Sequence, residues 1–161
     1  MIRVTIQDDF GPLAQLLNAA FMTVADEFGL TKENCATNAA FITTEELQCN
    51  LNELREFYRL DVDESPAGFI AIEKSAKEPG TFYIEKVAVH PQYRHLGLGR
   101  QMMAFAENRI KELGGERVSI GLIDANTRLK TWYQSLGYTE TGTRDFVHLP
   151  FRVCFMEKRM K

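Results

Sequence analysis

The segment covering residues 81–100 constrains this chain more than any other, because it contains a strand, a glycine-bearing loop and a helix start in succession. The run TFYIEKVAV (81–89) is rich in β-branched and aromatic residues and predicts a strand. Arg94, Gly97 and Gly99 follow it, and apolar residues then recur at helical spacing. The segment therefore predicts a strand, an R-x-x-G-x-G loop and a helix.

The loop has the features of an anion site. Glycines lack a Cβ atom, so their backbone N–H groups can approach phosphate oxygens closely. The first turn of a helix leaves four N–H groups unpaired and carries a partial positive charge. A pyrophosphate would suit such a loop. A tight strand-to-helix turn without any ligand would also explain the glycines, and the loop alone leaves both interpretations open.

The same stretch resembles motif A of the GNAT superfamily of N-acetyltransferases, which is Q/R-x-x-G-x-G/A after a strand ending in V-x-P or V-x-x-P. Arg94, Gly97 and Gly99 match the loop, and Val89 and Pro91 match the strand end. The resemblance implies that the loop amides hold the pyrophosphate of acetyl-coenzyme A. It also implies that the strand edge pairs with the pantetheine arm as a further strand would.

A second segment resembles motif B of that family, approximately N-x-x-A-x-x-x-Y-x-x-x-G-F/Y. Its matched positions are Asn126, Tyr133, Gly137 and Tyr138. Leu129 replaces the common alanine, a departure that concerns packing more than chemistry. Two motifs in the right order and separation are far more specific than either alone. The resemblance covers residues 69–139 well, and it covers the first 65 residues only by pattern.

Hydrophobic periodicity predicts the element order β-α-α-β-β-β-α-β-α-β-β within a single domain spanning residues 1–161. This order is that of the GNAT fold, a mixed α/β sheet. We expect Asp8 or Asp9 to cap the first helix, which should end near Gly29. A capping box of Thr43 and Glu46 should start the second.

Several boundaries follow from the same patterns. The second helix should carry an apolar stripe of Leu47, Leu51, Leu54 and Phe57. Strands are expected over 58–62 and 69–73, joined by a turn over 63–68. The final strands are expected over 138–143 and 152–157.

Composition narrows the class of protein. With 45% hydrophobic and 25% charged residues and a net charge of −3, the chain is typical of a soluble globular protein. No apolar run approaches 18 residues and the N-terminus does not resemble a signal peptide, so we expect no membrane partner and a cytoplasmic location. The three cysteines are widely spaced, which favours free thiols. The histidines do not cluster with them, so no metal site is expected.

Charge is distributed unevenly along the chain. Residues 1–75 contain 13 acids and 5 bases, a net of −8, whereas residues 76–161 contain 9 acids and 14 bases, a net of +5. The basic half contains the anion loop, which fits a cofactor with several phosphates. The acidic half fits a cationic acceptor such as an amine, or it reflects solvated helix faces. It makes nucleic acid an unfavourable partner.

Two residues are candidates for catalysis. Glu85 lies within an apolar strand, where a carboxyl should have a raised pKa and could accept a proton from the amine through water. Alternation places it on the same face as Tyr83, Val87 and Val89. It could instead be a structural carboxylate at the open end of the strand, or one paired with Lys86 or another cation. By resemblance, Tyr133 is the acid toward the leaving sulfur, although a core aromatic beside Trp132 would look the same.

The resemblance also implies a set of residues around the cofactor, with an oxyanion donor in the backbone near Val87. These residues are Val87, Ala88, Val89, Arg94, His95, Leu96, Gly97, Leu98, Gly99, Arg100, Asn126 and Tyr133. Arg128 and Lys130 could also meet phosphates, and Asn126 could simply cap a helix. Candidate acceptor-binding residues are Phe28, Tyr58, Phe146, His148 and Phe151, although core packing is the more common reason for such residues.

The leading hypothesis is therefore an N-acetyltransferase that moves the acetyl group of acetyl-coenzyme A directly to an amine of a small-molecule, peptide or protein acceptor. The first alternative is a coenzyme A-binding regulatory module without catalysis. The second is an acetyltransferase acting on charged transfer RNA, which the acidic half disfavours. A homodimer is compatible with the sequence. The acceptor cannot be read from these residues.

Overall fold

The computed structural model describes residues 1–161 and contains seven strands, four α-helices and two short 3₁₀ helices, η1 (Ala39–Phe41) and η2 (Pro91–Tyr93). The main elements are β1 (Ile2–Val4), α1 (Gly11–Phe28), α2 (Thr44–Asn50), β2 (Arg55–Val62), β3 (Ser65–Lys74), β4 (Thr81–Val89), α3 (Leu98–Glu112), β5 (Arg117–Ile123), α4 (Thr127–Ser135), β6 (Thr139–Asp145) and β7 (Arg152–Arg159). Their order confirms the predicted mixed α/β fold. No helix combines the length and the apolar character that crossing a membrane would require.

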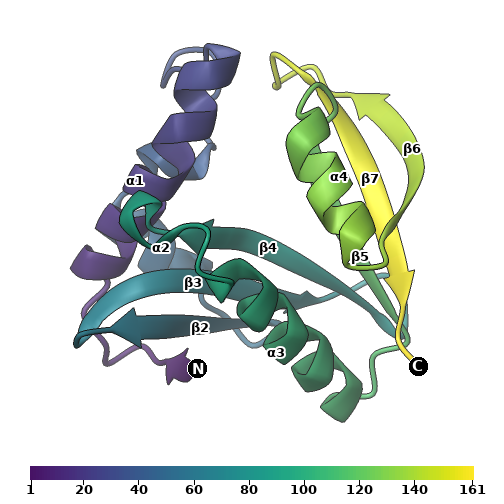
Figure 1. Cartoon of the computed structure of the whole chain (residues 1–161), viewed down its shortest axis with the longest axis horizontal. Helices are drawn as coiled ribbons and strands as arrows, with labels where there is room; N and C mark the ends of the chain where they lie inside the picture. Colours follow the sequence, from purple (N-terminus) through teal and green to yellow (C-terminus); the bar gives the residue numbers. More distant parts are fainter.

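The seven strands form one sheet in the order β1-β2-β3-β4-β5-β7-β6. All neighbours are antiparallel except β4 and β5. These two parallel strands pair only over Thr81–Tyr83 and Arg117–Ser119, and beyond that point they diverge (Figure 1). The edge of β4 that faces β5 is therefore unpaired from Ile84 to Val89.

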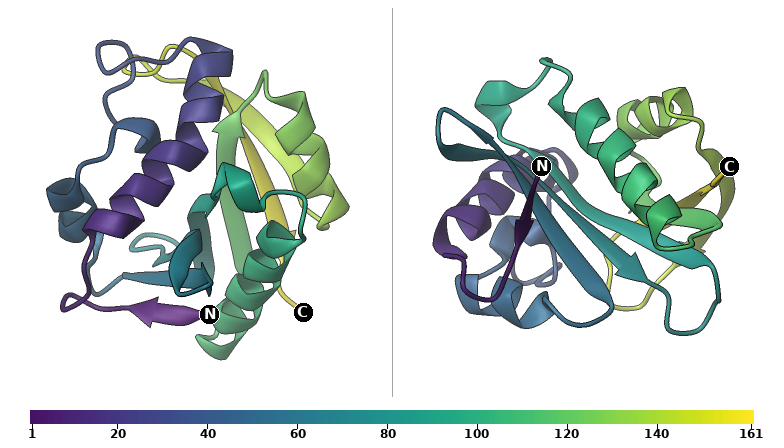
Figure 2. Two further views of the ribbon diagram at one scale, coloured as in Figure 1. Left: turned by 60° about the vertical axis from the view of Figure 1, so that its left-hand side comes forward. Right: turned by 90° about the horizontal axis from the view of Figure 1, so that it is seen from below.

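Helices cover both faces of the sheet. Helices α1 and α2 pack on one face of β2–β4, whereas α3 and α4 lie on the other (Figure 2). The largest buried cluster lies under α3 and includes Met102, Met103 and Ile110. A second cluster lies under α1 and includes Leu13, Leu17 and Leu47 from α2. Both helical layers therefore pack against β4, the strand that borders the region where β4 and β5 diverge.

The first helix begins without the predicted aspartate cap. Phe10 occupies the cap position and makes no side-chain cap bond, and proline lies in the first turn. Asp9 lies one residue before the cap position, and its Oδ1 accepts a hydrogen bond from Gly11 N at 2.9 Å. Asp8 accepts a hydrogen bond from Thr5 N in the preceding turn. The helix ends at Gly29 with a φ of 65°, as predicted.

The second helix is shorter than its apolar pattern suggested. The capping box of Thr43 and Glu46 is present as predicted. The helix stops at Asn50, because Leu51 adopts an extended backbone and Asn52 accepts from Leu54 N in a turn. Leu51 and Leu54 are therefore outside the helix. Phe57 belongs to β2, so the predicted stripe was correct only at Leu47.

The hairpin between β2 and β3 is tighter than predicted. Its turn consists of two residues, Asp63 and Glu64, both with positive φ, and the ladder resumes at Ser65. A bulge at Leu60/Asp61 accommodates Pro66 within the strand. The tighter turn lengthens β3, which starts at Ser65. Strand β2 is longer than predicted at its other end, where it starts at Arg55, and β6 and β7 are longer at their C-terminal ends.

Candidate active site

A cleft of about 890 Å³ occupies the space where β4 and β5 diverge. Its walls come from β4, the loop after β4, the start of α3, the end of β5, helix α4 and helix α1. The cleft contains most of the residues expected to bind a cofactor, including Gly97, Gly99, Asn126 and Tyr133. Residues from Ala20 of α1 to Phe155 of β7 therefore meet at one opening in the sheet.

The two loop glycines have different structural roles. Gly97 is the cap residue of α3 with a φ of 80°, and a Cβ atom built there would have no neighbour within 4 Å. Its backbone is thus exposed at a helix start without a side-chain cap. A Cβ atom at Gly99 would instead lie 3.2 Å from the Trp132 ring of α4. Gly97 leaves space for a ligand, whereas Gly99 lets the two helices approach.

Arg94 is directed at helix α1. Its Nη2 donates to Ala20 O at 2.8 Å, its Nη1 donates to Thr23 Oγ1 at 3.1 Å, and its Nε donates to Val89 O at 3.4 Å. Burial lowers the pKa of the Arg94 guanidinium. The side chain therefore ties the loop to α1 and to the end of β4.

The other basic candidates differ in position. Arg100 lines the cleft and donates to Ser135 Oγ at 3.2 Å, which links α3 to α4. Arg128 also lines the cleft and pairs with Glu27 of α1 at 3.2 Å. His95 and Leu98 line it as well. Leu96 is 67% exposed and lies outside it, as does Lys130.

A β-bulge in β4 changes which face each residue occupies. Ala71 pairs with Glu85 and Phe69 pairs with Ala88, so two residues of β4 have no partner in the ladder. One of them, Lys86, has a φ of 50°. Directly opposed residues share a face, so Glu85 lies with Ala71 on the α1 face.

The bulge corrects the prediction that Glu85, Val87 and Val89 share a face. Val87 and Val89 pack against the cluster under α3, opposite Glu85. Simple alternation fails because the extra residue shifts the register by one. Neither Lys86 nor Val87 pairs with β3 or with β5, so their backbone groups border the cleft without ladder partners.

Glu85 lies within a small network of charges. Its Oε2 is 3.8 Å from both Lys86 Nζ and Arg55 Nη2, and Arg55 makes a closer 2.7 Å contact with Glu73. The Glu85 side chain is 36% exposed. Burial and the nearby Glu73 raise the pKa of Glu85, while Lys86 and Arg55 oppose the rise. Both predicted features, an elevated pKa and a pairing with Lys86, are thus present.

Tyr133 lies at the α4 wall of the cleft. Its ring packs edge-on against Trp132 and Tyr138, with centroid distances of 4.9 and 5.8 Å. Its hydroxyl makes no hydrogen bond within the protein, and burial raises the pKa of Tyr133. The hydroxyl keeps its proton and is therefore suited to donate a hydrogen bond.

Asn126 caps α4 by accepting a hydrogen bond from Leu129 N at 3.2 Å.

None of the predicted acceptor-binding residues lines the cleft. Tyr58 packs against Phe105 under α3 and donates to Glu56, which corrects its assignment. Phe28 and Phe151 pack against a third core cluster. Phe146 and His148 stack on each other in the β6–β7 connection, with centroids 5.7 Å apart.

Phe155 is a cleft residue that the sequence reasoning missed. It lies on β7, and its ring is 6.4 Å from that of Phe146. The alternation within β7 separates Phe155 from the buried Cys154 and Met156. That pattern was the available signal for a residue facing away from α4.

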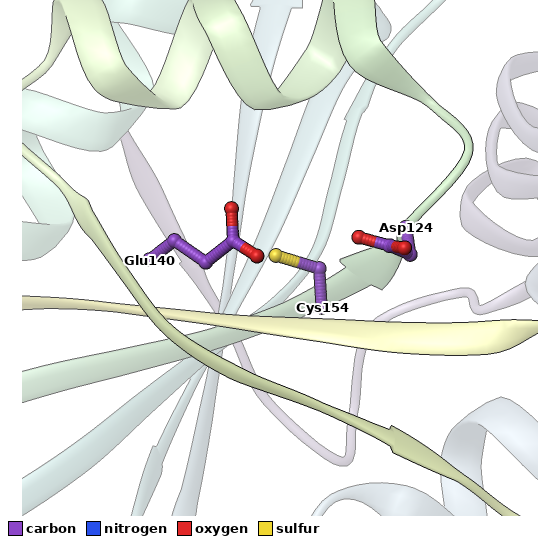
Figure 3. A group of neighbouring side chains, drawn as sticks. All are labelled: Asp124, Glu140 and Cys154. Atoms are coloured by element: carbon purple, nitrogen blue, oxygen red, sulfur yellow. The ribbon is translucent and has the colours of Figure 1, made fainter.

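Three potential metal ligands gather outside the cleft, although no metal site was predicted. Ligand atoms of Asp124, Glu140 and Cys154 lie within 4.8 Å of one another (Figure 3). Lys130 Nζ lies 2.8 Å from Asp124 Oδ1 and 3.3 Å from Glu140 Oε2. The chain thus supplies its own cation to these carboxylates.

A model described as the acetyltransferase (GNAT) family matches residues 20–138, a span that contains both motifs and most of the cleft. The chain belongs to the GNAT family. A relative from Lactobacillus delbrueckii subsp. lactis, named "Uncharacterized N-acetyltransferase in pepI 3'region", is 29% identical over 96 residues, which is 56% of each chain. A ycf52-like uncharacterized N-acetyltransferase from Prochlorococcus marinus is 38% identical over 53 residues, covering 33% of this chain and 28% of its own length. The chain spans about half or less of these relatives.

Solved structures share the GNAT fold over nearly the whole chain. The PaiA N-acetyltransferase from Thermoplasma acidophilum, solved with coenzyme A, has a TM-score of 0.74 at 19% identity and covers 97% of this chain and 95% of its own. The ribosomal-protein-S18-alanine N-acetyltransferase from Escherichia coli has a TM-score of 0.75 at 15% identity, with coverages of 98% and 91%. At such identities the likeness shows the fold alone.

Proposed function

We propose that the protein transfers the acetyl group of acetyl-coenzyme A directly to an amine of a small-molecule, peptide or protein acceptor. The observation that carries this proposal is the divergence of β4 from β5, which leaves the β4 edge from Ile84 to Val89 unpaired beside the loop glycines. An extended pantetheine arm can pair with such an edge. The Gly97 backbone and the start of α3 can take the phosphates.

Arg94 supports phosphate binding by holding the loop in place. Its three contacts with α1 and β4 fix the loop before any ligand arrives, which lowers the ordering cost of binding. Arg100 and Arg128 also line the cleft, and each can meet phosphate charge.

Glu85 is proposed as the base, directly or through a water. A lysine-like amine has a pKa of about 10.4 and is almost wholly protonated at neutral pH. The raised pKa of Glu85 makes it a better proton acceptor than an exposed carboxylate. The unpaired backbone at Lys86 and Val87 can donate to the carbonyl oxygen as negative charge develops.

Tyr133 is proposed to donate a hydrogen bond to the leaving sulfur. Tyrosine titrates near 10 and a thiol near 8.5 in water, and burial widens this difference by raising the pKa of Tyr133. Full proton transfer to the sulfur is therefore unfavourable.

Phe155 and the apolar α1 residues Phe21 and Val24 are proposed to line the acceptor end of the cleft.

The ion pairs of Glu85 favour one alternative, a coenzyme A-binding module without catalysis. Release of free thiol from acetyl-coenzyme A separates the two functions. The assay should use a panel of polyamines, amino acids, aminoglycosides and peptides with free N-termini. Amine-dependent thiol release supports the transferase, whereas tight binding without release for any amine supports the module.

A further inference from the structure

Lys86 is the only lysine that lines the cleft. It lies at the β4 bulge in a left-handed backbone conformation, with a φ of 50°. Its side chain is only 19% exposed, and its Nζ lies 3.8 Å from Glu85 Oε2. A non-glycine residue in this conformation is uncommon, and here it places a primary amine beside the proposed base.

This amine lies where an acceptor amine would lie if it gave its proton directly to Glu85. Such an acceptor must bring its nitrogen close to the carboxylate, and Lys86 Nζ is already within ion-pair distance of it. The other charged groups acting on Lys86 are Arg55 of β2 and Glu73 of β3. Burial lowers the pKa of Lys86, against the effect of Glu85, so its neutral and nucleophilic form is more accessible than that of a surface lysine.

We propose that the protein acetylates its own Lys86 when acetyl-coenzyme A is bound and no acceptor occupies the cleft, an inference that rests on the proposed function. The neutral Nζ attacks the thioester carbonyl, a C–N bond forms and the C–S bond breaks. Glu85 accepts the proton lost by the nitrogen, and coenzyme A leaves as the thiolate and takes a proton from water. The product is acetyl-lysine at position 86, a stable amide.

The modification has a consequence for the site. Acetylation removes the positive charge of Lys86, leaving Arg55 and Glu73 as the charged groups beside Glu85. Because Lys86 lowers the pKa of Glu85, the modified protein should hold the Glu85 proton more tightly. A true acceptor competes with Lys86 for the same position, so it should slow the self-reaction.

The test incubates the full chain with acetyl-coenzyme A alone and follows intact mass, with peptide mapping to locate the label. We expect one acetyl group on Lys86, added with a first-order rate constant independent of protein concentration. Lys86→Arg, which keeps the positive charge, should lose this label completely. Lys77→Arg, at an exposed lysine outside the cleft, should leave the Lys86 label unchanged.

Calorimetry on the same sample measures acetyl-coenzyme A binding, which separates a failure of the proposed acetyltransferase function from a failure of the self-acetylation inference. Normal binding with an unlabelled Lys86 overturns the inference alone, as does a Lys86 label that forms no faster than the label on Lys77. A rate constant that rises with protein concentration would mean transfer between molecules and would also overturn it. Absence of binding overturns the proposed function and the inference with it.

Discussion

Glu85 and Lys86 are consecutive residues of β4, yet the bulge between them and β3 brings Lys86 Nζ to 3.8 Å from Glu85 Oε2. The proposed base, Glu85, therefore has the positive charge of the adjacent Lys86 beside it. Glu85 can act only when ionised, so turnover should rise with pH through its pKa, which lies above the ordinary glutamate value. Glu85→Gln should lower turnover and remove this rise.

The counter-charge provides a control for that experiment. Lys86 lowers the pKa of Glu85, so Lys86→Met should move the rising limb of the pH–rate profile to higher pH while Glu73 and Arg55 remain. If the rising limb of the pH–rate profile stays at the same pH in Lys86→Met, or persists in Glu85→Gln, the ionisation that controls turnover belongs to a group other than Glu85.

Arg94→Met should destabilise the protein even without a ligand. The change removes three hydrogen bonds to α1 and β4, and a hydrogen bond to a charged group typically contributes about 1.5–3 kcal/mol. Thermal unfolding of the free protein measures this, and affinity for acetyl-coenzyme A should fall as well. Unchanged stability combined with weaker binding would instead mean that the guanidinium acts mainly on phosphate.

Tyr133→Phe should leave stability close to wild type, because the hydroxyl makes no hydrogen bond within the protein and the ring contacts with Trp132 and Tyr138 persist. Turnover should fall by about 10²-fold or less, the lower end of the range for acid catalysis. The decisive assay compares thioesters whose leaving thiols differ in basicity. The turnover of the variant should fall least with the most acidic leaving thiol. An equal fall in turnover across the series would mean that Tyr133 acts only by packing.

Hydrophobic periodicity predicted the element order. Motif A predicted the strand, the glycine turn and the helix start that border the cleft, because these are local features of sequence. Alternation correctly placed Glu85 on the same face as Tyr83. It failed for Val87 and Val89, because the β4 bulge uses Lys86, a non-glycine residue, at positive φ. The short hairpin at Asp63 and Glu64 was hidden by Pro66 and Gly68, which read as turn residues but belong to β3. In each case pairing between strands overrode a local preference.

The acceptor end of the cleft was the least predictable part. Aromatic residues near or in the connections were candidates, but Phe28 and Phe151 pack against the third core cluster instead of lining the cleft. Phe155 lies on a strand whose faces can be assigned only once its neighbours β5 and β6 are known. Long-range packing, which a single sequence does not display, decided these positions.

The most direct test of the account compares acetyl-coenzyme A binding to Gly97→Ala and Gly114→Ala. Both glycines have a φ near 80°, and a Cβ atom at either would have no neighbour within 4 Å, so the two changes should carry similar backbone strain. Only Gly97 lies in the cleft. Calorimetry should show affinity reduced at least about tenfold, or about 1.4 kcal/mol, for Gly97→Ala and unchanged for Gly114→Ala. Equal affinities in two folded variants would contradict the assignment of the cleft between β4 and β5 as the acetyl-coenzyme A site.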